Sequence, residues 1–219
     1  MSHRYNKTQK ERLEQYNTTF ENALNHPIIT PTLAEFGYDE VKLSEGKQIF
    51  FVARNAYDFK ITEDDETKEA KYGLDTKLEE LFSIYYPHRK KAKVIFKNDP
   101  VILHLLGING CIPTDYLSRM EIIKKFYTEI LNDETLQQRF AAIKITLEDL
   151  TKANNVAAEV VSNRFEYVRE KGESQDATKN KLAALKIIDD WMDDFYEIAE
   201  IAFEDNPQLL EVLGVYVRS

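Results

Sequence analysis

The chain has 219 residues, of which 43% are hydrophobic and 11% aromatic, enough apolar surface for a packed core. Its net charge of −9 argues against a general affinity for nucleic acid, whose phosphates favour basic surfaces. The single cysteine, Cys111, excludes an intramolecular disulfide and a cysteine-based zinc cluster, and no apolar run approaches the roughly 18 residues of a membrane span. The first residues also contain no apolar signal core, so we expect a cytoplasmic protein.

Three helices are predicted in the first third of the chain. The first spans about Thr8–Leu24. The second is short and opens at Thr30 and Pro31, because threonine is a good N-cap and proline fits the first helical position. A long third helix starts after Asp39 and is expected to end in a polar turn near Thr62–Asp65.

A fourth helix is predicted to follow this turn. Pro87 lies inside it and is expected to kink it, since proline lacks the backbone N–H of a helical hydrogen bond. A short helix comes next, with Asp99 as N-cap, Pro100 as first residue and Gly107 as its stop. The fourth helix should bury one face, formed by Leu78, Leu81, Tyr85, His88, Ala92 and Ile95.

The second half of the chain predicts the same order of elements. One helix is expected over Asp115–Leu131 behind Thr114 as N-cap, and a short one opens at Asp133. A long helix starts after Thr146 and should end in a turn near Lys171–Ser174. The next helix has the clearest apolar period in the chain, given by Leu185, Ile188, Met192, Phe195, Ala199 and Ala202.

The two halves are also similar in sequence. Residues 96–107, FKNDPVILHLLG, match residues 203–214, FEDNPQLLEVLG, where Asn206, Pro207 and Gly214 repeat the cap, first residue and stop. The same shift of 107 residues aligns further identities over some ninety residues without a gap. This register predicts an internal duplication, with repeat 1 over about residues 8–107 and repeat 2 over about 115–214.

The fold class is therefore predicted to be all-α, because no segment alternates with period two for long enough to form a sheet. We expect an internally duplicated helical bundle whose two pseudo-symmetric halves pack as a single domain over residues 1–219. Phe50 and Phe51 align with Ala157 and Ala158, a large-for-small exchange that would let facing helices interdigitate.

The C-terminal segment resembles a known family. Residues 185–214, LKIIDDWMDDFYEIAEIAFEDNPQLLEVLG, together with GESQDAT at 172–178, are similar to the closing segment of a family of uncharacterised bacterial helical proteins. The resemblance covers about the last forty residues and reaches the first half only through the duplication. It implies a bacterial origin and a helical bundle, and it implies no activity and no site residues.

Two charged clusters are candidates for interaction. Around Trp191, acidic residues three and four apart could bind a divalent cation, although a solvated helix face is the commoner reading of such a run. No histidine has a glutamate three residues before it, which argues against a di-iron bundle. The basic run over residues 88–93 could contact phosphate or an acidic partner, or the acidic cluster of the other half or of a second molecule, although a solvated face is again the commoner reading. The candidate contacts are Arg89, Lys90, Lys91 and Lys93 on one side and Asp189, Asp190, Asp193 and Asp194 on the other.

A pocket is the second possibility. His88 lies in the apolar stripe of a helix that Pro87 should loosen, and neighbouring tyrosines could supply hydroxyl groups to a ligand. The simpler interpretation is a partly buried histidine hydrogen-bonded to a tyrosine or a carbonyl. The candidate pocket residues are Tyr85, Tyr86, His88 and Trp191.

Motifs of phosphate-binding loops, dinucleotide-binding folds, serine hydrolases and zinc proteases are all absent from the sequence. We therefore predict no catalytic residues, no metal and no cofactor. The leading hypothesis is a non-enzymatic interaction or scaffold protein that binds a protein partner or itself, without nucleic acid or membrane. The alternative is a bundle that binds a small ligand or a metal in a pocket between the two halves.

Overall fold

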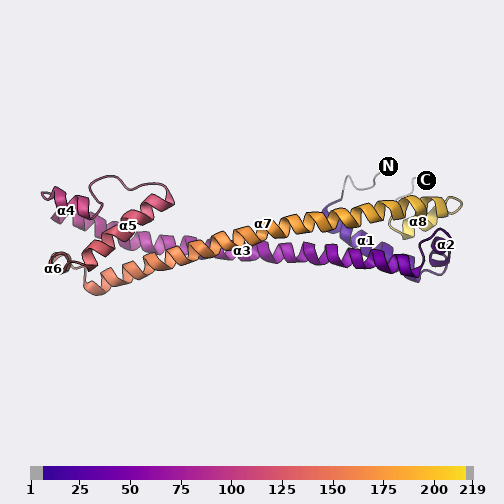
Figure 1. Cartoon of the computed structure of the whole chain (residues 1–219), viewed down its shortest axis with the longest axis horizontal. Coiled ribbons are helices and arrows are strands. Elements are labelled where there is room, and N and C mark those ends of the chain that lie inside the picture. Colours follow the sequence, from indigo (N-terminus) through magenta and orange to yellow (C-terminus); the bar gives the residue numbers. More distant parts are fainter. Residues whose placement is uncertain (1–6, 216–219) are drawn as a thin grey trace. The chain divides into compact units, whose positions relative to one another are not determined.

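The structure is a computed structural model that describes residues 7–215. In this range the chain is all-α, as predicted, and Figure 1 shows its eight helices. In chain order they are α1 (Gln9–Asn25), α2 (Ile29–Glu35), α3 (Glu40–Ile95), α4 (Pro100–Leu105), α5 (Tyr116–Leu131), α6 (Glu134–Ala141), α7 (Leu147–Ala202) and α8 (Gln208–Val212).

Two of these helices, α3 and α7, are 56 residues long. The turns predicted near Thr62–Asp65 and Lys171–Ser174 are therefore wrong, because both segments are helical. Most residues of these two segments are charged, and a helix accepts charged residues readily. The single glycine, Gly172, costs only about 1 kcal/mol in a helix interior. Pro87 also lies inside α3, which continues to Ile95.

The predicted N-caps hold at most helix starts. Asp39, Asp133 and Thr146 each accept a hydrogen bond from the backbone N–H three residues later, at 2.9, 3.1 and 3.1 Å. Asp99 caps α4 in the same way, with Pro100 as the first helical residue. These side chains satisfy N–H groups that have no partner within the helix.

Two helix starts differ from the prediction. The N-cap of α5 is Asp115 rather than Thr114, and its carboxylate accepts the Ser118 N–H at 2.9 Å. A carboxylate is favoured at this end of the helix dipole, and the hydrogen bond with Ser118 lowers the pKa of Asp115. Helix α2 begins at Ile29, two residues early, so Pro31 still lies in the first turn, where its missing N–H costs nothing.

The stops of the two short helices are confirmed. Gly107 and Gly214 have φ of +65° and +79°, a conformation that glycine adopts without strain. The residue after each glycine donates its N–H to the carbonyl five residues earlier, at 2.9 Å in both cases. The start of α8 differs, however, because Pro207 rather than Asn206 occupies the N-cap position.

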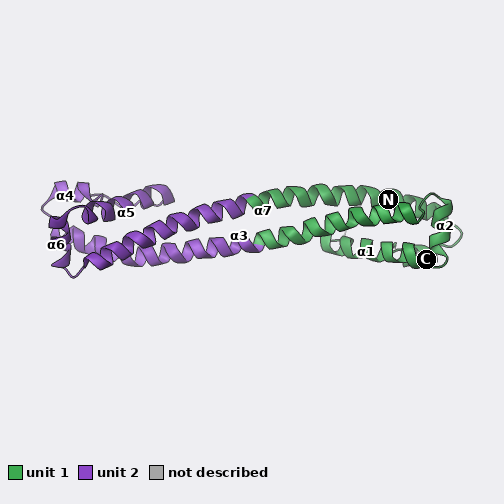
Figure 2. Ribbon diagram, turned by 60° about the horizontal axis from the view of Figure 1, so that its bottom comes forward, with its two compact units in different colours: residues 1–64, 173–219 green, residues 65–172 purple. Residues whose placement is uncertain are grey.

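The chain forms two compact units, which Figure 2 colours separately. Unit 1 contains α1, α2, the part of α3 up to Asp64, the part of α7 from Glu173 and α8. Unit 2 is residues 65–172, with the rest of α3 and α7 together with α4, α5 and α6. The units do not coincide with the predicted repeats, because each unit takes parts from both halves of the sequence.

The core of unit 1 joins its parts of α3 and α7 to α1, α2 and α8. The predicted apolar face of α7 is confirmed, since Leu185, Ile188, Met192, Phe195 and Ala199 are at most 3% exposed. These side chains pack in one cluster whose other large members are Leu13, Tyr16, Phe20, Ile29, Leu33, Leu43, Phe50 and Phe203.

Unit 2 has its own core. Leu81, Tyr85 and Ala92 of α3 are fully buried, and Leu78 and Ile95 pack against them as partly buried neighbours. Helices α5, α6 and α7 supply the rest, including Phe126, Tyr127, Phe140, Leu150 and Val160. None of the helices between residues 7 and 215 has an apolar stretch long enough to cross a bilayer.

Candidate functional site

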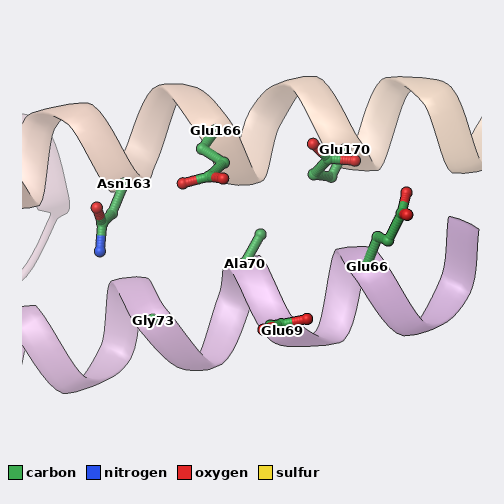
Figure 3. Close-up of a pocket in the computed structure, with 7 residues that line it drawn as sticks. All are labelled: Glu66, Glu69, Ala70, Gly73, Asn163, Glu166 and Glu170. Carbon is green, nitrogen blue, oxygen red and sulfur yellow. The ribbon is translucent and has the colours of Figure 1, made fainter.

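An acidic groove lies between α3 and α7 in unit 2. It has a volume of about 460 Å³ and is shown in Figure 3. Ala70 and Gly73 leave space on the α3 side, where a Cβ added at Gly73 would lie 3.6 Å from the amide nitrogen of Asn163. The other lining residues are Glu66, Glu69, Asn163, Glu166 and Glu170.

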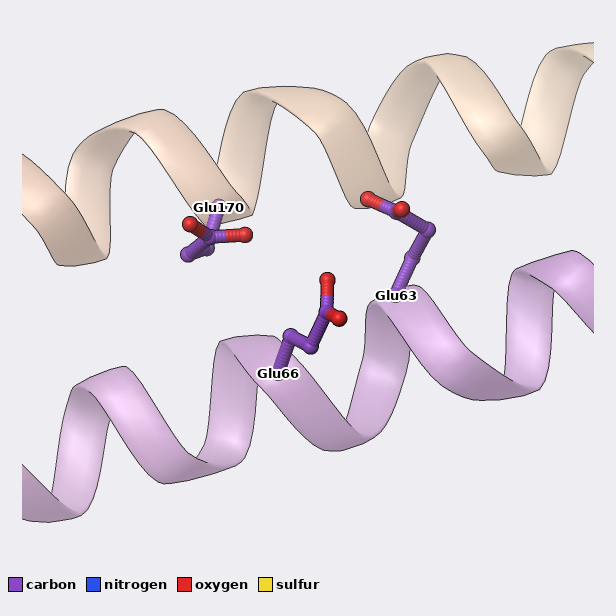
Figure 4. A group of neighbouring side chains, drawn as sticks. All are labelled: Glu63, Glu66 and Glu170. Carbon is purple, nitrogen blue, oxygen red and sulfur yellow. The ribbon is translucent and has the colours of Figure 1, made fainter.

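The four glutamates give this groove a negative potential. Glu66, Glu69 and Glu166 are exposed, while Glu170 is 7% exposed and accepts a hydrogen bond from Arg169 Nε at 3.1 Å. Oxygen atoms of Glu66 and Glu170 approach within 4.8 Å, and Figure 4 shows both side chains with Glu63, one helical turn before Glu66. Carboxylate oxygens this close favour a hard cation or a basic side chain.

Sequence reasoning missed this groove, because its residues come from two helices whose register the sequence alone does not give. The alignment of Glu63 and Glu66 with Glu170 and Glu173 was the available signal. It points to acidic positions shared by the two halves, without showing which of them face each other.

The basic candidates lie in unit 2 and contact its loops. Arg89 and Lys93 both donate to the carbonyl of Gly110, at 2.5 and 3.2 Å. Lys91 donates to the carbonyl of Ile143 at 3.1 Å. These three side chains therefore hold the segments that follow α4 and α6, while Lys90 is exposed.

The acidic candidates lie in unit 1, in different environments. Asp189 is buried, and its two oxygens accept from Arg12 Nη1 at 2.6 Å and from the Tyr16 hydroxyl at 2.8 Å. Asp190 is exposed and pairs with Lys186 at 2.6 Å. Asp193 is half-buried and Asp194 is exposed. The four aspartates thus do not form one uniform surface.

The candidate pocket residues are divided between the units. Trp191 belongs to unit 1, where its ring stacks on Phe195 at a centroid distance of 5.6 Å. Tyr85 is fully buried in unit 2, and burial raises the pKa of its hydroxyl although nearby Arg89 opposes the shift. Tyr86 is exposed and stacks on Phe82.

His88 is a half-buried histidine beside a tyrosine, with its Nδ1 atom 3.2 Å from the Tyr127 hydroxyl. Burial lowers the pKa of His88, while the Asp149 carboxylate has a weaker opposite effect. Burial also raises the pKa of Tyr127, so its hydroxyl stays protonated at neutral pH. The geometry matches the simpler interpretation of this residue.

The lowered pKa of His88 predicts a pH effect on stability. The unfolded chain binds the proton more tightly than the folded chain, so stability should fall as the pH drops below about 6.5. We expect the thermal midpoint, followed by far-UV circular dichroism, to be lower at about pH 5.5 than at about pH 7.5. His88→Phe, which introduces the residue found at position 195, should reduce this difference.

His104 provides the control for this experiment. It lies in the same unit on α4 and is exposed. His104→Gln should leave the pH difference unchanged. A full pH difference in the His88→Phe protein would show that another group titrates.

A second surface, on α3 of unit 1, combines exposed apolar side chains with polar ones. Val41, Val52 and Phe59 are 67%, 62% and 55% exposed, although α3 buries its opposite face through Leu43, Phe50 and Ala53. Between them on the same exposed side lie Glu45, Gln48 and Asn55. We call these six residues, Val41, Glu45, Gln48, Val52, Asn55 and Phe59, the α3 stripe.

The comparisons with known proteins add no assignment. No family model matches the chain, and no curated protein and no solved structure gives a significant match.

Proposed function

We propose that this chain is a non-enzymatic cytoplasmic interaction protein that binds another protein through the α3 stripe. The observation that carries the proposal is the exposure of Val41, Val52 and Phe59 along one line of a helix. Isolated exposed apolar residues are ordinary, but a row at helical spacing is the pattern by which one helix packs on another.

An internal duplication, which we also propose, supplies a comparison for this row. Helices α3 and α7 have equal length, and both their starts and their ends are 107 residues apart. The same shift takes the three apolar residues of the stripe to Glu148, Glu159 and Glu166, all of them exposed. At these three positions α7 therefore carries charge where α3 carries apolar surface.

The expected gain is large enough to support binding. Complete burial of a valine or phenylalanine side chain contributes about 1.5 to 3 kcal/mol, and more than half of each of these three side chains is accessible. A neighbouring helix that covered all three would recover several kcal/mol before the cost of association.

Most of the charged residues that the sequence offers as contacts are less suited to bind a partner. Arg89, Lys91 and Lys93 are bonded to carbonyls within unit 2, and Asp189 is bonded within unit 1. The small-ligand alternative has its best support in the acidic groove, where the potential would select a cationic ligand.

A site-specific photo-crosslinker tests the proposal. Benzoylphenylalanine placed at Val52 of the full chain should give a covalent adduct when an extract of its native cells is illuminated. The same group at Glu159, the corresponding position of α7, is the matched control and should give far less adduct. Absence of any adduct at Val52 would reject the α3 stripe as a protein-binding surface.

A further inference from the structure

We propose that unit 1 has a binding site for a small molecule that carries a phosphate monoester group, in a cleft at the start of α1. This site uses none of the residues of the α3 stripe, and it does not depend on the proposed function. It is supported by the shape of the cleft, by the charges of its lining and by the hydrogen-bond donors that lie there.

The cleft, which we call the α1 cleft, lies where α1 begins beside α3 and α7. Figure 2 shows that α1 runs alongside only part of the stretches of α3 and α7 that belong to unit 1. The cleft has a volume of about 420 Å³, a size typical of small-molecule sites, and residues 8–10 of α1 form one side of it. The other lining residues are Tyr57, Lys60, Ile61 and Asp64 of α3 and Lys181 of α7.

Three lysine side chains give the α1 cleft an excess of positive charge. Lys60 pairs with Asp64, the carboxylate of the lining, and its amine lies 3.4 Å from the Ser174 hydroxyl. Lys10 and Lys181 have no carboxylate partner among residues 7–215. Two positive charges in the cleft therefore remain unpaired.

Unpaired lysines are unusual in this unit, where acidic residues outnumber basic ones. Apart from Lys7, every other lysine and arginine described in unit 1 pairs with a carboxylate at 3.8 Å or less. Lys7 instead donates to Gln15 at 2.7 Å. Lys10 and Lys181 are far apart in sequence, yet both line the same cleft. Unpaired charges that meet at one cavity favour a ligand of opposite charge.

Neutral donors lie beside the two amines. Tyr57 is half-buried, and its hydroxyl has no hydrogen-bond partner among residues 7–215. At the start of α1, the side chains of Thr8 and Glu11 each accept the backbone N–H of the other residue, at 3.2 and 2.7 Å. The N–H groups of Gln9 and Lys10 have no acceptor within the helix, and both residues line the cleft. The cleft thus offers hydroxyl and amide donors together with two amines.

These features favour a phosphate monoester over other anions. Such a group carries nearly two negative charges at neutral pH and has three oxygens that accept hydrogen bonds. Its charge matches the two unpaired lysines, whereas a carboxylate has one charge and two oxygens. Amide N–H groups at the start of a helix also stabilise phosphate. Ile61, which is 48% exposed, and the Tyr57 ring provide apolar surface for the rest of the ligand.

An NMR titration of the full, isotope-labelled chain tests the site, with phenyl phosphate as the probe at neutral pH and constant ionic strength. The backbone amide signals of Gln9 and Lys10 should shift and saturate, with a dissociation constant in the low millimolar range or below, as expected for a ligand of this size. Benzoate has the same ring with one charge, and inorganic phosphate has no ring, so each should bind about fivefold more weakly. Absence of saturable shifts, or equal affinity for either of these two anions, would overturn the proposal.

Lysine variants test the role of the unpaired charges. Lys10→Gln combined with Lys181→Gln should weaken phenyl phosphate binding about tenfold, because both charges are lost. Lys124→Gln combined with Lys152→Gln is the matched control, since it makes the same change in net charge at exposed positions of unit 2 and should leave the affinity unchanged. Far-UV circular dichroism and the fluorescence of Trp191, which lies in unit 1, check the fold of each variant. Equal weakening by the two variants would show that only the overall charge attracts the probe, and would overturn the site.

Discussion

Replacing Gly46 with alanine is expected to destabilise unit 1 by about 1 to 3 kcal/mol, the range for overpacking a well-packed core. Trp191 on α7 packs directly on the α3 backbone at this glycine. A Cβ atom at position 46 would lie 2.3 Å from atom Cζ2 of the indole ring, far inside contact distance. The ring cannot easily move away, because Phe20, Tyr38 and Phe195 pack around it.

Gly73 provides a matched control on the same helix. Its added Cβ would lie 3.6 Å from the Asn163 amide, an ordinary contact. Gly73→Ala should therefore be neutral or should stabilise unit 2 by about 0.5 to 1 kcal/mol, because glycine is the poorer helix former.

Urea unfolding measures both changes, with circular dichroism reporting all helices and Trp191, the only tryptophan, reporting unit 1. The Gly46→Ala protein should show an earlier fluorescence transition, while the Gly73→Ala protein should not. Equal behaviour of the two variants would contradict the close approach of Trp191 to α3.

Replacing Asp189 with alanine is expected to cost about 3 kcal/mol of stability. The carboxylate joins α7 to two side chains of α1, Arg12 and Tyr16, through bonds of 2.6 and 2.8 Å. Its removal leaves the Arg12 guanidinium and the Tyr16 hydroxyl without this partner in a largely buried place. Breaking a buried pair costs about 3 to 5 kcal/mol, and the 17% exposure of the Arg12 side chain favours the lower end.

The next residue is the control for this variant. The Asp190 side chain is 58% exposed and pairs with the exposed Lys186, so Asp190→Ala should change stability by less than about 0.5 kcal/mol. Unfolding in urea, followed by the fluorescence of Trp191, separates the two variants. A similar cost for both would mean that the Asp189 contacts contribute little.

Both variants come from a region that the sequence presents as one acidic cluster. The periodic stripe from Leu185 to Ala199 was predictable, because apolar residues recur every three or four positions. The role of Asp189 was not, because the burial of a carboxylate depends on the arginine and the tyrosine that reach it from α1. Local periodicity reveals the buried face of a helix. Whether a polar residue at the edge of that face is buried depends on partners that are distant in sequence.

The starts and stops of helices could be predicted from the sequence for the same reason as the apolar face of α7, because both depend on residues close together in the chain. Caps at Asp39, Asp99, Asp133 and Thr146 depend on a few adjacent residues, so composition and spacing are enough to find them. The interruptions expected in the middle of α3 and α7 are wrong, because polar composition alone does not end a helix. Charged residues without proline are equally compatible with a solvated helix.

The acidic groove and the α3 stripe differ in how readily each can be predicted from the sequence. The acidic groove requires Glu66 and Glu170 to face each other across two helices, which depends on their packing register. The α3 stripe could have been found, because the ungapped alignment already places Val41, Val52 and Phe59 on three glutamates. What the alignment lacked was the burial of each position, which distinguishes a core residue from an exposed one.

The division of the chain into units has a consequence for its synthesis. Unit 2 is one continuous segment, so all of its residues are present once position 172 has left the ribosome. Unit 1 consists of two separate segments of the chain. Its core is complete only after the end of α7 and α8 have been synthesised, long after α1, α2 and the first part of α3. Their apolar faces therefore remain uncovered while more than half of the chain is still being translated, a period in which nascent chains depend most on chaperones.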